Sequence, residues 1–263
     1  MKEKSKKILG NHIETRNLKD SIVADNFRGR IIFLSETACG WQNQLENICP
    51  TRALSKKDND VMALDNGKCI MCGYCTESFP QLIKMENKCH NPTKSKNQLI
   101  EYSNPYEHLP EKSYEQMGNE LKAKITKLFG RSLAIRQVDA GSCNGCEIEI
   151  TALNNPIYDI ERFGIHFVSS PRHADVLLVT GPASRNMETA LLRTYEATPS
   201  PKIVIAVGAC ACSGGIFGDT YATTGGIDKI VPVDVYIPGC PPRPEVLIQG
   251  LLLAVDRMIT NGI

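Results

Sequence analysis

Residues 202–210 read KIVIAVGAC, an apolar run that ends in a glycine and a cysteine. The run Ile203–Val207 and the earlier run Val176–Val179 are apolar at every position rather than at alternate positions. Strands of this kind are buried on both faces, as in a parallel sheet that helices cover on both sides. The two runs therefore predict an α/β domain, with a cysteine close behind one of its strands.

Shorter apolar runs alternate with helical patterns over the whole of residues 131–263. This alternation predicts one domain with a flavodoxin-like parallel sheet in α/β/α layers. The expected strands are residues 132–138, 165–168, 176–179, 203–207 and 233–237, and the expected helices are residues 147–153, 186–197 and 244–259.

The first half of the chain has a different texture. Residues 1–30 are polar and charged and predict an N-terminal arm, whereas residues 31–90 combine short segments, turn residues and closely spaced cysteines, as in a small domain. Residues 91–130 begin as a proline-bearing linker that should run over a surface. They continue as an amphipathic helix at residues 111–129, which should stop at Gly130 and pack on the next domain, with binding of a partner subunit as the alternative.

The composition excludes several classes of protein. With 30 basic and 29 acidic side chains the formal net charge is +1, so the chain lacks the basic excess of a nucleic-acid binder. No apolar run approaches the roughly 18 residues of a membrane-spanning helix, and the lysine-rich start leads into no apolar signal core. We therefore expect a cytoplasmic chain in which the cysteines, 11 in all, serve as metal ligands rather than in disulfides, with their spacing deciding which of them bind.

Four cysteines of the C-terminal half follow predicted strands. Cys143 and Cys146 come after the first strand, Cys210 after the fourth and Cys240 after the fifth, each in a segment rich in Gly or Pro that predicts a loop. Loops after the carboxyl ends of parallel strands meet at one edge of the sheet. Four thiolates at such an edge suit a [4Fe–4S] cluster. Because these four complete the ligand set, Cys212 is expected to be unligated.

Two other uses of this edge fit the pattern less well. A flavin or nucleotide phosphate needs a Ser/Thr/Gly loop that leads into a helix, and here two cysteines occupy that loop. A site of four cysteines and zinc has the right ligand count, but structural zinc usually stabilises small, loop-rich folds. A zinc-stabilised interaction module without a redox role stays open as the alternative of another class.

The N-terminal cysteines match a second template. Bacterial ferredoxins repeat the run C-x₂-C-x₂-C-x₃-C-P, and the fourth cysteine of each run binds the other run's cluster. Laid on residues 39–50, the run keeps Cys39 and Cys49 but has Gln42 and Leu45 at the two positions between them.

Laid on residues 69–80, the same run keeps Cys69, Cys72 and Cys75 but has Phe79 in place of the fourth cysteine. Because the fourth position of each run belongs to the other run's cluster, one cluster would draw on positions 39, 42, 45 and 79. It would retain a single thiolate of four, that of Cys39. The other would retain all its ligands, which are Cys49, Cys69, Cys72 and Cys75. Residues 31–90 are therefore predicted to be a small α+β ferredoxin-like domain that has lost one of its two clusters, with Cys39 and Cys89 unligated.

With these residues in place, the C-terminal half resembles the small subunit of [NiFe] hydrogenases and the related 20 kDa, B-type subunit of respiratory complex I. The residues that carry the resemblance are DAGSCNGCE at 139–147, GAC at 208–210 and PGCPP at 238–242. Complex I subunits have adjacent cysteines in the first motif, whereas two residues separate Cys143 from Cys146, as in hydrogenases. The stretches YDIERFGI at 158–165 and SPRHAD at 170–175 resemble the formate-hydrogenlyase and energy-converting branch.

The resemblance implies an electron-transfer subunit of a membrane-associated oxidoreductase complex. It implies that Cys143, Cys146, Cys210 and Cys240 hold the proximal [4Fe–4S] cluster, and that a separate large subunit holds the nickel–iron site. Further iron–sulfur and membrane subunits would complete the complex on the cytoplasmic, inner face of the cell membrane. The alternative within this superfamily is the equivalent subunit of a complex I-like quinone or ferredoxin oxidoreductase without hydrogenase activity. The fused ferredoxin-like domain is unusual for such a subunit and would extend the relay to two [4Fe–4S] clusters in one chain.

Glu147 directly follows one predicted ligand and begins a predicted helix. It could relay protons toward the large subunit. An acidic side chain is also favourable at a helix N-terminus for electrostatic reasons alone. The sequence leaves both roles open.

Overall fold

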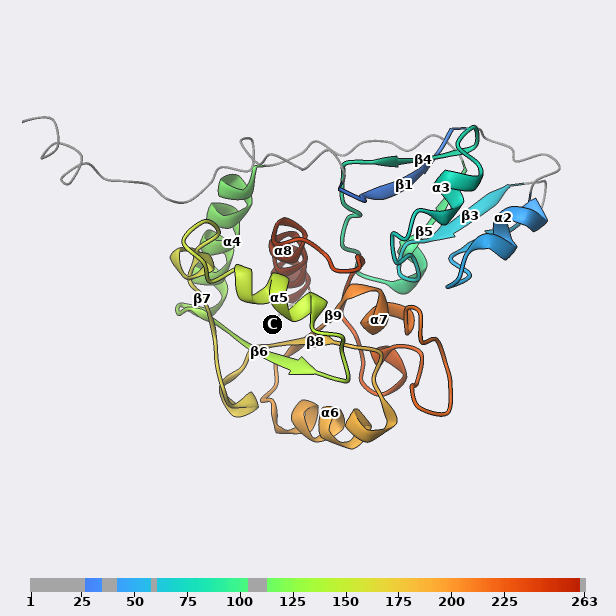
Figure 1. The fold of residues 1–263 in the computed structure, drawn as a ribbon. Helices are drawn as coiled ribbons and strands as arrows, with labels where there is room; N and C mark the ends of the chain where they lie inside the picture. Colours follow the sequence, from blue (N-terminus) through green and yellow to red (C-terminus); the bar gives the residue numbers. More distant parts are fainter. Residues whose placement is uncertain (1–26, 35–41, 58–60, 104–112, 261–263) are drawn as a thin grey trace, which may run out of the picture.

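The computed structural model describes residues 27–34, 42–57, 61–103 and 113–260 (Figure 1). The C-terminal part is built on five parallel strands in the order β10-β9-β8-β6-β7. Numbered along the chain and read from the β7 edge, this is the flavodoxin order 2-1-3-4-5. The strands are β6 (Leu133–Asp139), β7 (Ile165–Phe167), β8 (Val176–Thr180), β9 (Ile203–Val207) and β10 (Val235–Ile237).

Helices cover both faces of this sheet, as the apolar runs predict (Figure 1). In β9, Ile203 and Ile205 face one helical layer, whereas Val204 and Ala206 face the other. The flavodoxin-like α/β/α prediction is therefore confirmed. The first layer contains α4 (Tyr114–Phe129), α5 (Gly145–Ala152) and α8 (Pro244–Thr260), and the second contains α6 (Arg185–Ala197) and α7 (Gly208–Ser213).

Helix α4 shows how local signals set the boundaries of an element. The Ser113 hydroxyl accepts a hydrogen bond from the Gln116 N–H at 3.3 Å, and the Gln116 side chain accepts one from the Ser113 N–H at 3.0 Å. This capping box satisfies two N–H groups that the first turn leaves without partners. The helix ends at Gly130 in the left-handed conformation, as expected. Its buried stripe, which includes Leu121, packs against α8.

The N-terminal part is a small α+β unit with two antiparallel sheets, as predicted. One sheet pairs β1 with β4, and the other has the order β2-β3-β5. Two short helices complete a core in which Leu45, Leu54 and Ile83 are buried. The elements are β1 (Arg30–Phe33), α2 (Gln42–Ile48), β2 (Leu54–Lys56), β3 (Met62–Asp65), α3 (Tyr74–Ser78), β4 (Ile83–Glu86) and β5 (Ile100–Tyr102).

Part of the stretch predicted to be a surface linker, residues 91–103, is built into the fold. Within residues 91–103, Thr93 exchanges two backbone hydrogen bonds with Tyr236 at 2.9 and 2.8 Å, Leu99 is buried, and β5 pairs with β3. The expectation of a surface path was wrong here because β5 pairs with the second edge of β3. The stretch contains only a few apolar residues, such as Leu99, and its mainly polar composition gave no sign of this pairing. Residues 104–112, the rest of that stretch, lie outside the described residues.

Within the part of the chain that the structure describes, no helix combines the length and the hydropathy that crossing a membrane requires.

Candidate metal centres

The carboxyl edge of the parallel sheet brings together the four C-terminal cysteines that the sequence singled out. Cys143 lies in the loop after β6 and Cys240 in the loop after β10. Cys146 and Cys210 lie in helices, α5 and α7, so the prediction of loops at all four positions was wrong for these two. Helix α7 begins directly behind β9, where Gly208 has a positive φ of 85°, and Asn144, with a φ of 70°, immediately precedes the first residue of α5.

The four thiols lie close enough to influence one another electrostatically. Burial, then the charge of Glu147 and those of the other three cysteines, raise the pKa of Cys146 well above its usual range. Burial, followed by the charges of Cys240 and Cys143, raises the pKa of Cys210 to about 11. The group therefore shares one poorly solvated region, although Cys143 and Cys240 keep exposed surface.

Glycines make the room that these sulfurs occupy. A Cβ atom on Gly208 would lie 2.6 Å from the Cys146 Sγ, and one on Gly215 would lie 3.0 Å from the Cys210 Sγ. Side-chain hydrogen bonds shape the first loop as well. One carboxylate oxygen of Asp139 accepts bonds from the N–H groups of Gly141 and Ser142 at 2.9 and 2.7 Å. The Gly-rich motif is therefore a close-packed support for the cysteines.

Glu147 is buried in the first turn of α5. One of its carboxylate oxygens accepts a hydrogen bond from the Thr180 hydroxyl. The other oxygen is buried and has no hydrogen-bond partner among the described residues. Both roles suggested for Glu147, proton relay and favourable helix electrostatics, stay predictions.

The N-terminal part gathers a second group of four cysteines. Burial raises the pKa of Cys69 to about 12, and the charges of Cys75, Cys49 and Cys72 add to this effect. Burial, with the charges of Cys49 and Cys72, raises the pKa of Cys75 to about 11. The Ala53 N–H donates a hydrogen bond to the Cys49 Sγ at 3.2 Å. These are the four cysteines that the ferredoxin template assigns to a single cluster.

Two of the three positions that the template had lost are occupied by core residues. Leu45 and Phe79 are buried in the core of the N-terminal part, and Gln42 begins α2. Cys39 lies outside the described residues. Cys89 packs against the core of the C-terminal part, and burial raises its pKa to about 11.

Cys212 points away from the sheet edge into the second core layer. Its Sγ lies 3.7 Å from the Ile237 carbonyl oxygen and 3.9 Å from that of Ala206. It is fully buried, and burial raises the pKa of its thiol well above the usual range. Cys212 therefore contributes to packing.

Each group of four thiols fits a [4Fe–4S] cluster. Among the described residues, no three Cys, His, Asp or Glu side chains lie close enough to hold a single metal ion. A cubane cluster needs wider spacing, because each thiolate binds a different iron. Desolvated thiols beside main-chain N–H groups are the surroundings in which such clusters are held and their potentials tuned.

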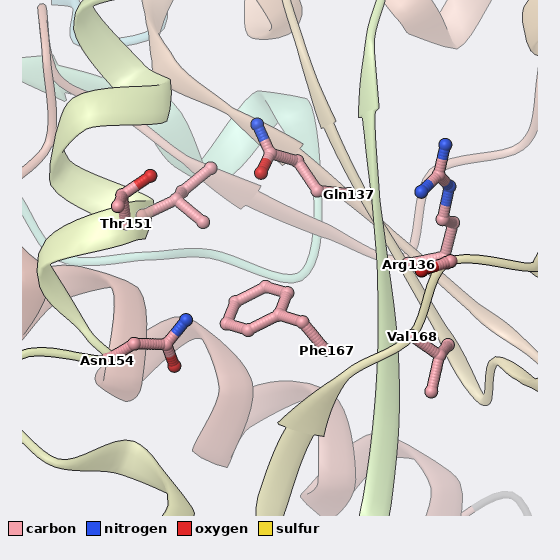
Figure 2. Close-up of a pocket in the computed structure, with 8 residues that line it drawn as sticks. Arg136, Gln137, Thr151, Asn154, Phe167 and Val168 are labelled. Atoms are coloured by element: carbon pink, nitrogen blue, oxygen red, sulfur yellow. The ribbon is translucent and has the colours of Figure 1, made fainter.

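A hollow of about 260 Å³ lies at the end of α5 that is distant from Cys146, between β6 and the end of β7 (Figure 2). Gln137, Thr151 and Asn154 supply hydrogen-bonding groups to its wall, and the Nε atom of Arg136 is buried without a partner in the described part of the chain. No pattern in the sequence singled out this hollow. It is lined by Arg136, Gln137, Ile150, Thr151, Asn154, Phe167, Val168 and Ser169.

Fold and site together define a class: an α/β subunit with four cysteines gathered at the carboxyl edge of a flavodoxin-like sheet. The family described as NADH ubiquinone oxidoreductase, 20 kDa subunit, matches residues 143–254, a range that starts at Cys143 and contains Cys146, Cys210 and Cys240. The chain belongs to this family. The family binds a [4Fe–4S] cluster. The match does not extend to the N-terminal cysteines.

Relatives come from two kinds of complex. Formate hydrogenlyase subunit 7 of Escherichia coli is 55% identical over 138 residues, which are 52% of this chain and 54% of that protein. The probable membrane-bound hydrogenase subunit mbhJ of Pyrococcus furiosus is 51% identical over 136 residues, 52% of this chain and 81% of that protein. The B-type subunit of NADH-quinone oxidoreductase from Citrifermentans bemidjiense is 51% identical over 113 residues, 43% of this chain and 66% of that protein. The chain thus spans about half the length of the formate hydrogenlyase subunit.

Proposed function

We propose that this chain is an electron-transfer subunit of a [NiFe] hydrogenase complex of the formate-hydrogenlyase type. The observation that carries the proposal is the position of Cys143, Cys146, Cys210 and Cys240 behind β6, β9 and β10, at one edge of the sheet. The relatives from formate hydrogenlyase and a membrane-bound hydrogenase support it. The two-residue spacing between Cys143 and Cys146 supports it further.

In this proposal the four C-terminal cysteines hold a proximal [4Fe–4S] cluster. When bound, the cluster supplies reversible one-electron chemistry. The protein contributes four thiolates, a poorly solvated edge and the close approach of Gly208 and Gly215 to the sulfurs. The nickel–iron site belongs to a separate large subunit, so this chain carries electrons and leaves the chemistry of hydrogen to its partner.

We propose that Cys49, Cys69, Cys72 and Cys75 hold a second [4Fe–4S] cluster. Residues 31–90 would then be a ferredoxin-like domain with one of its two clusters lost, between an arm at 1–30 and the linker and helix at 91–130. The burial of Leu45 and Phe79 at two of the lost positions supports this assignment. The 131–263 domain would dock on the large subunit, in a complex held peripherally at the inner face of the cell membrane by further iron–sulfur and membrane subunits.

The runner-up function is the equivalent subunit of a complex I-like oxidoreductase without hydrogenase activity. The identity of 51% with the NADH-quinone oxidoreductase relative favours it. Purification of the native complex separates the two. A hydrogenase subunit should co-purify with a nickel-containing partner, and its clusters should be reduced under hydrogen gas. A nickel-free complex whose clusters are not reduced under hydrogen gas would support the runner-up function.

The clusters themselves are tested on the isolated chain. Iron and sulfide analysis of anaerobically purified protein should give about eight irons per chain for two cubane clusters. Low-temperature electron paramagnetic resonance (EPR) of the reduced protein should lose one signal in Cys72→Ala and a different one in Cys146→Ala. The control Cys89→Ala should keep both. Bound zinc without iron would instead support the alternative of a zinc-stabilised interaction module without a redox role.

A further inference from the structure

The two cysteine groups face each other across the contact between the two parts of the chain. The turn before Cys69 contacts helix α7, which carries Cys210, and residues 27 and 28 contact both the Cys72 carbonyl oxygen and Arg243. The loops that carry Cys72 and Cys240 therefore lie on the facing sides of the two parts. Two sets of contacts hold them in this position.

The first set joins the turn before Cys69 to helix α7. The Ser213 hydroxyl donates a hydrogen bond to the Gly67 carbonyl oxygen at 2.6 Å. A Cβ atom on Gly67 would lie 3.4 Å from the Cys212 Cβ, so the turn and the helix are in van der Waals contact. The turn that leads into the N-terminal group therefore rests on the helix that carries Cys210.

The second set lies at residues 27 and 28, just before β1. The Arg28 guanidinium donates a hydrogen bond to the Cys72 carbonyl oxygen at 2.6 Å and lies 3.9 Å from the Glu77 carboxylate. The ring of its neighbour Phe27 lies 5.2 Å from the guanidinium of Arg243, in cation–π range. Arg243 follows Cys240 by three residues. Two adjacent residues thus touch the Cys72 loop and the Cys240 loop at once.

We infer that Phe27 and Arg28 are positioning residues, a clamp that holds the Cys72 loop against the Cys240 loop and fixes the separation of the two cysteine groups. This inference rests on the proposed function, because a clamp between the two cysteine groups matters only if electrons pass between them. Electron exchange between two centres weakens steeply as they move apart, so a relay needs a fixed gap. Neither Phe27 nor Arg28 is a cluster ligand.

The exposure of Arg28 separates this role from a general contribution to the fold. Its side chain is 59% exposed, and the Glu77 side chain is 69% exposed. Ion pairs this exposed add little to stability. Replacing Arg28 should therefore leave the fold and both ligand sets intact while it frees the Cys72 loop to move.

The test is the magnetic interaction between the two reduced clusters in the intact, anaerobically purified chain. Two paramagnetic centres held close together split and broaden each other's EPR signals. The dithionite-reduced wild type should show this splitting, and Cys72→Ala should give the simple signal of one cluster. The double variant Phe27→Leu/Arg28→Gln should keep its iron but show a weaker splitting, because the contact between Ser213 and Gly67 remains. Arg193→Gln is the control, an exposed arginine on α6, and should match the wild type.

Each outcome is decisive. Unchanged splitting in the double variant with full iron would overturn the clamp, and so would a wild type with two reduced clusters and no splitting. If the double variant loses iron, Phe27→Leu alone decides, because it leaves the bond from Arg28 to Cys72 in place. A wild type with only about four irons would refute the second cluster of the proposed function, and the clamp would fall with it.

Discussion

Gly208 lies at the junction of β9 and α7 and has a φ of 85°. The space that a side chain would occupy there is filled by the Cys146 sulfur. We predict that Gly208→Ala removes the EPR signal of the C-terminal cluster and spares that of the N-terminal cluster. The added methyl group would lie 2.6 Å from the Cys146 Sγ, too close unless the sulfur moves. Iron analysis should show a loss of about half the metal, as expected for one cubane of two.

Gly164→Ala is the matched control for this prediction. Gly164 also has a positive φ, 77°, but a Cβ there would meet no atom within 4 Å. Both variants carry the left-handed strain of about 1–2 kcal/mol for a non-glycine residue. Gly164→Ala should therefore lower the free energy of unfolding by that amount and keep both clusters. Equal cluster loss in the two variants would show that strain, and not the sulfur contact, causes it.

His90 is a buried titratable residue outside both cysteine groups. Burial, aided by the nearby charge of Arg30, lowers its pKa to about 3, and neither ring nitrogen has a partner among the described residues. The unfolded chain takes up a proton near pH 6.5, where the folded chain does not. Stability should therefore fall as pH drops below about 6.5, and this loss levels off near the folded pKa of about 3.

At pH 5.5, one unit below the unfolded pKa, His90 should cost the folded state about 1.4 kcal/mol relative to pH 7.5. Urea unfolding of the wild type and of His90→Gln at both pH values measures this difference. The variant should lose less stability on acidification by that amount. His173→Gln, which replaces an exposed histidine, should behave like the wild type. Parallel losses in wild type and His90→Gln would contradict the assignment.

At the scale of the elements, the apolar pattern predicted most of the C-terminal part. The strand expected at 203–207 is Ile203–Val207, and the helix expected at 186–197 is Arg185–Ala197. The pattern missed α7, because six residues that include two cysteines and one glycine offer no helical period. It also missed β5, whose pairing depends on an unfilled edge of β3 rather than on its own composition.

Helix α4 gives a prediction in which packing opposes helix propensity. A Cβ atom on Gly118 would lie 2.2 Å from the Phe163 ring, so the helix packs on that ring through a position without a side chain. Gly118→Ala should gain about 1 kcal/mol of helix propensity but lose more than that to overpacking, which costs about 1–3 kcal/mol. We expect a net destabilisation in urea unfolding.

Asn119→Ala is the control at the next, exposed position of the same helix. It gains propensity without meeting another side chain and should be neutral or slightly stabilising. If Gly118→Ala stabilises the protein as much as Asn119→Ala does, the contact with Phe163 is looser than the structure describes.

At the scale of the whole molecule, the spacing of the cysteines predicted two groups of four, and the binding of a cluster by each group stays a prediction. The ferredoxin run predicted which N-terminal cysteines belong together, and the strand ends predicted the C-terminal group. The contact between the two parts could not be predicted in this way. Gly67, Ser213 and Phe27 resemble ordinary turn and arm residues in the sequence, and only their positions in space show that they join the two groups.

The central claim is that each part of this chain holds its own [4Fe–4S] cluster. Native mass spectrometry of the anaerobically purified chain tests it most directly, because it counts metal atoms on the folded protein. We predict the mass of the polypeptide with two [4Fe–4S] clusters, reduced by one cluster in Cys72→Ala and by the other in Cys146→Ala. A fully occupied species with a single cluster, or one with zinc in place of iron, would contradict the account.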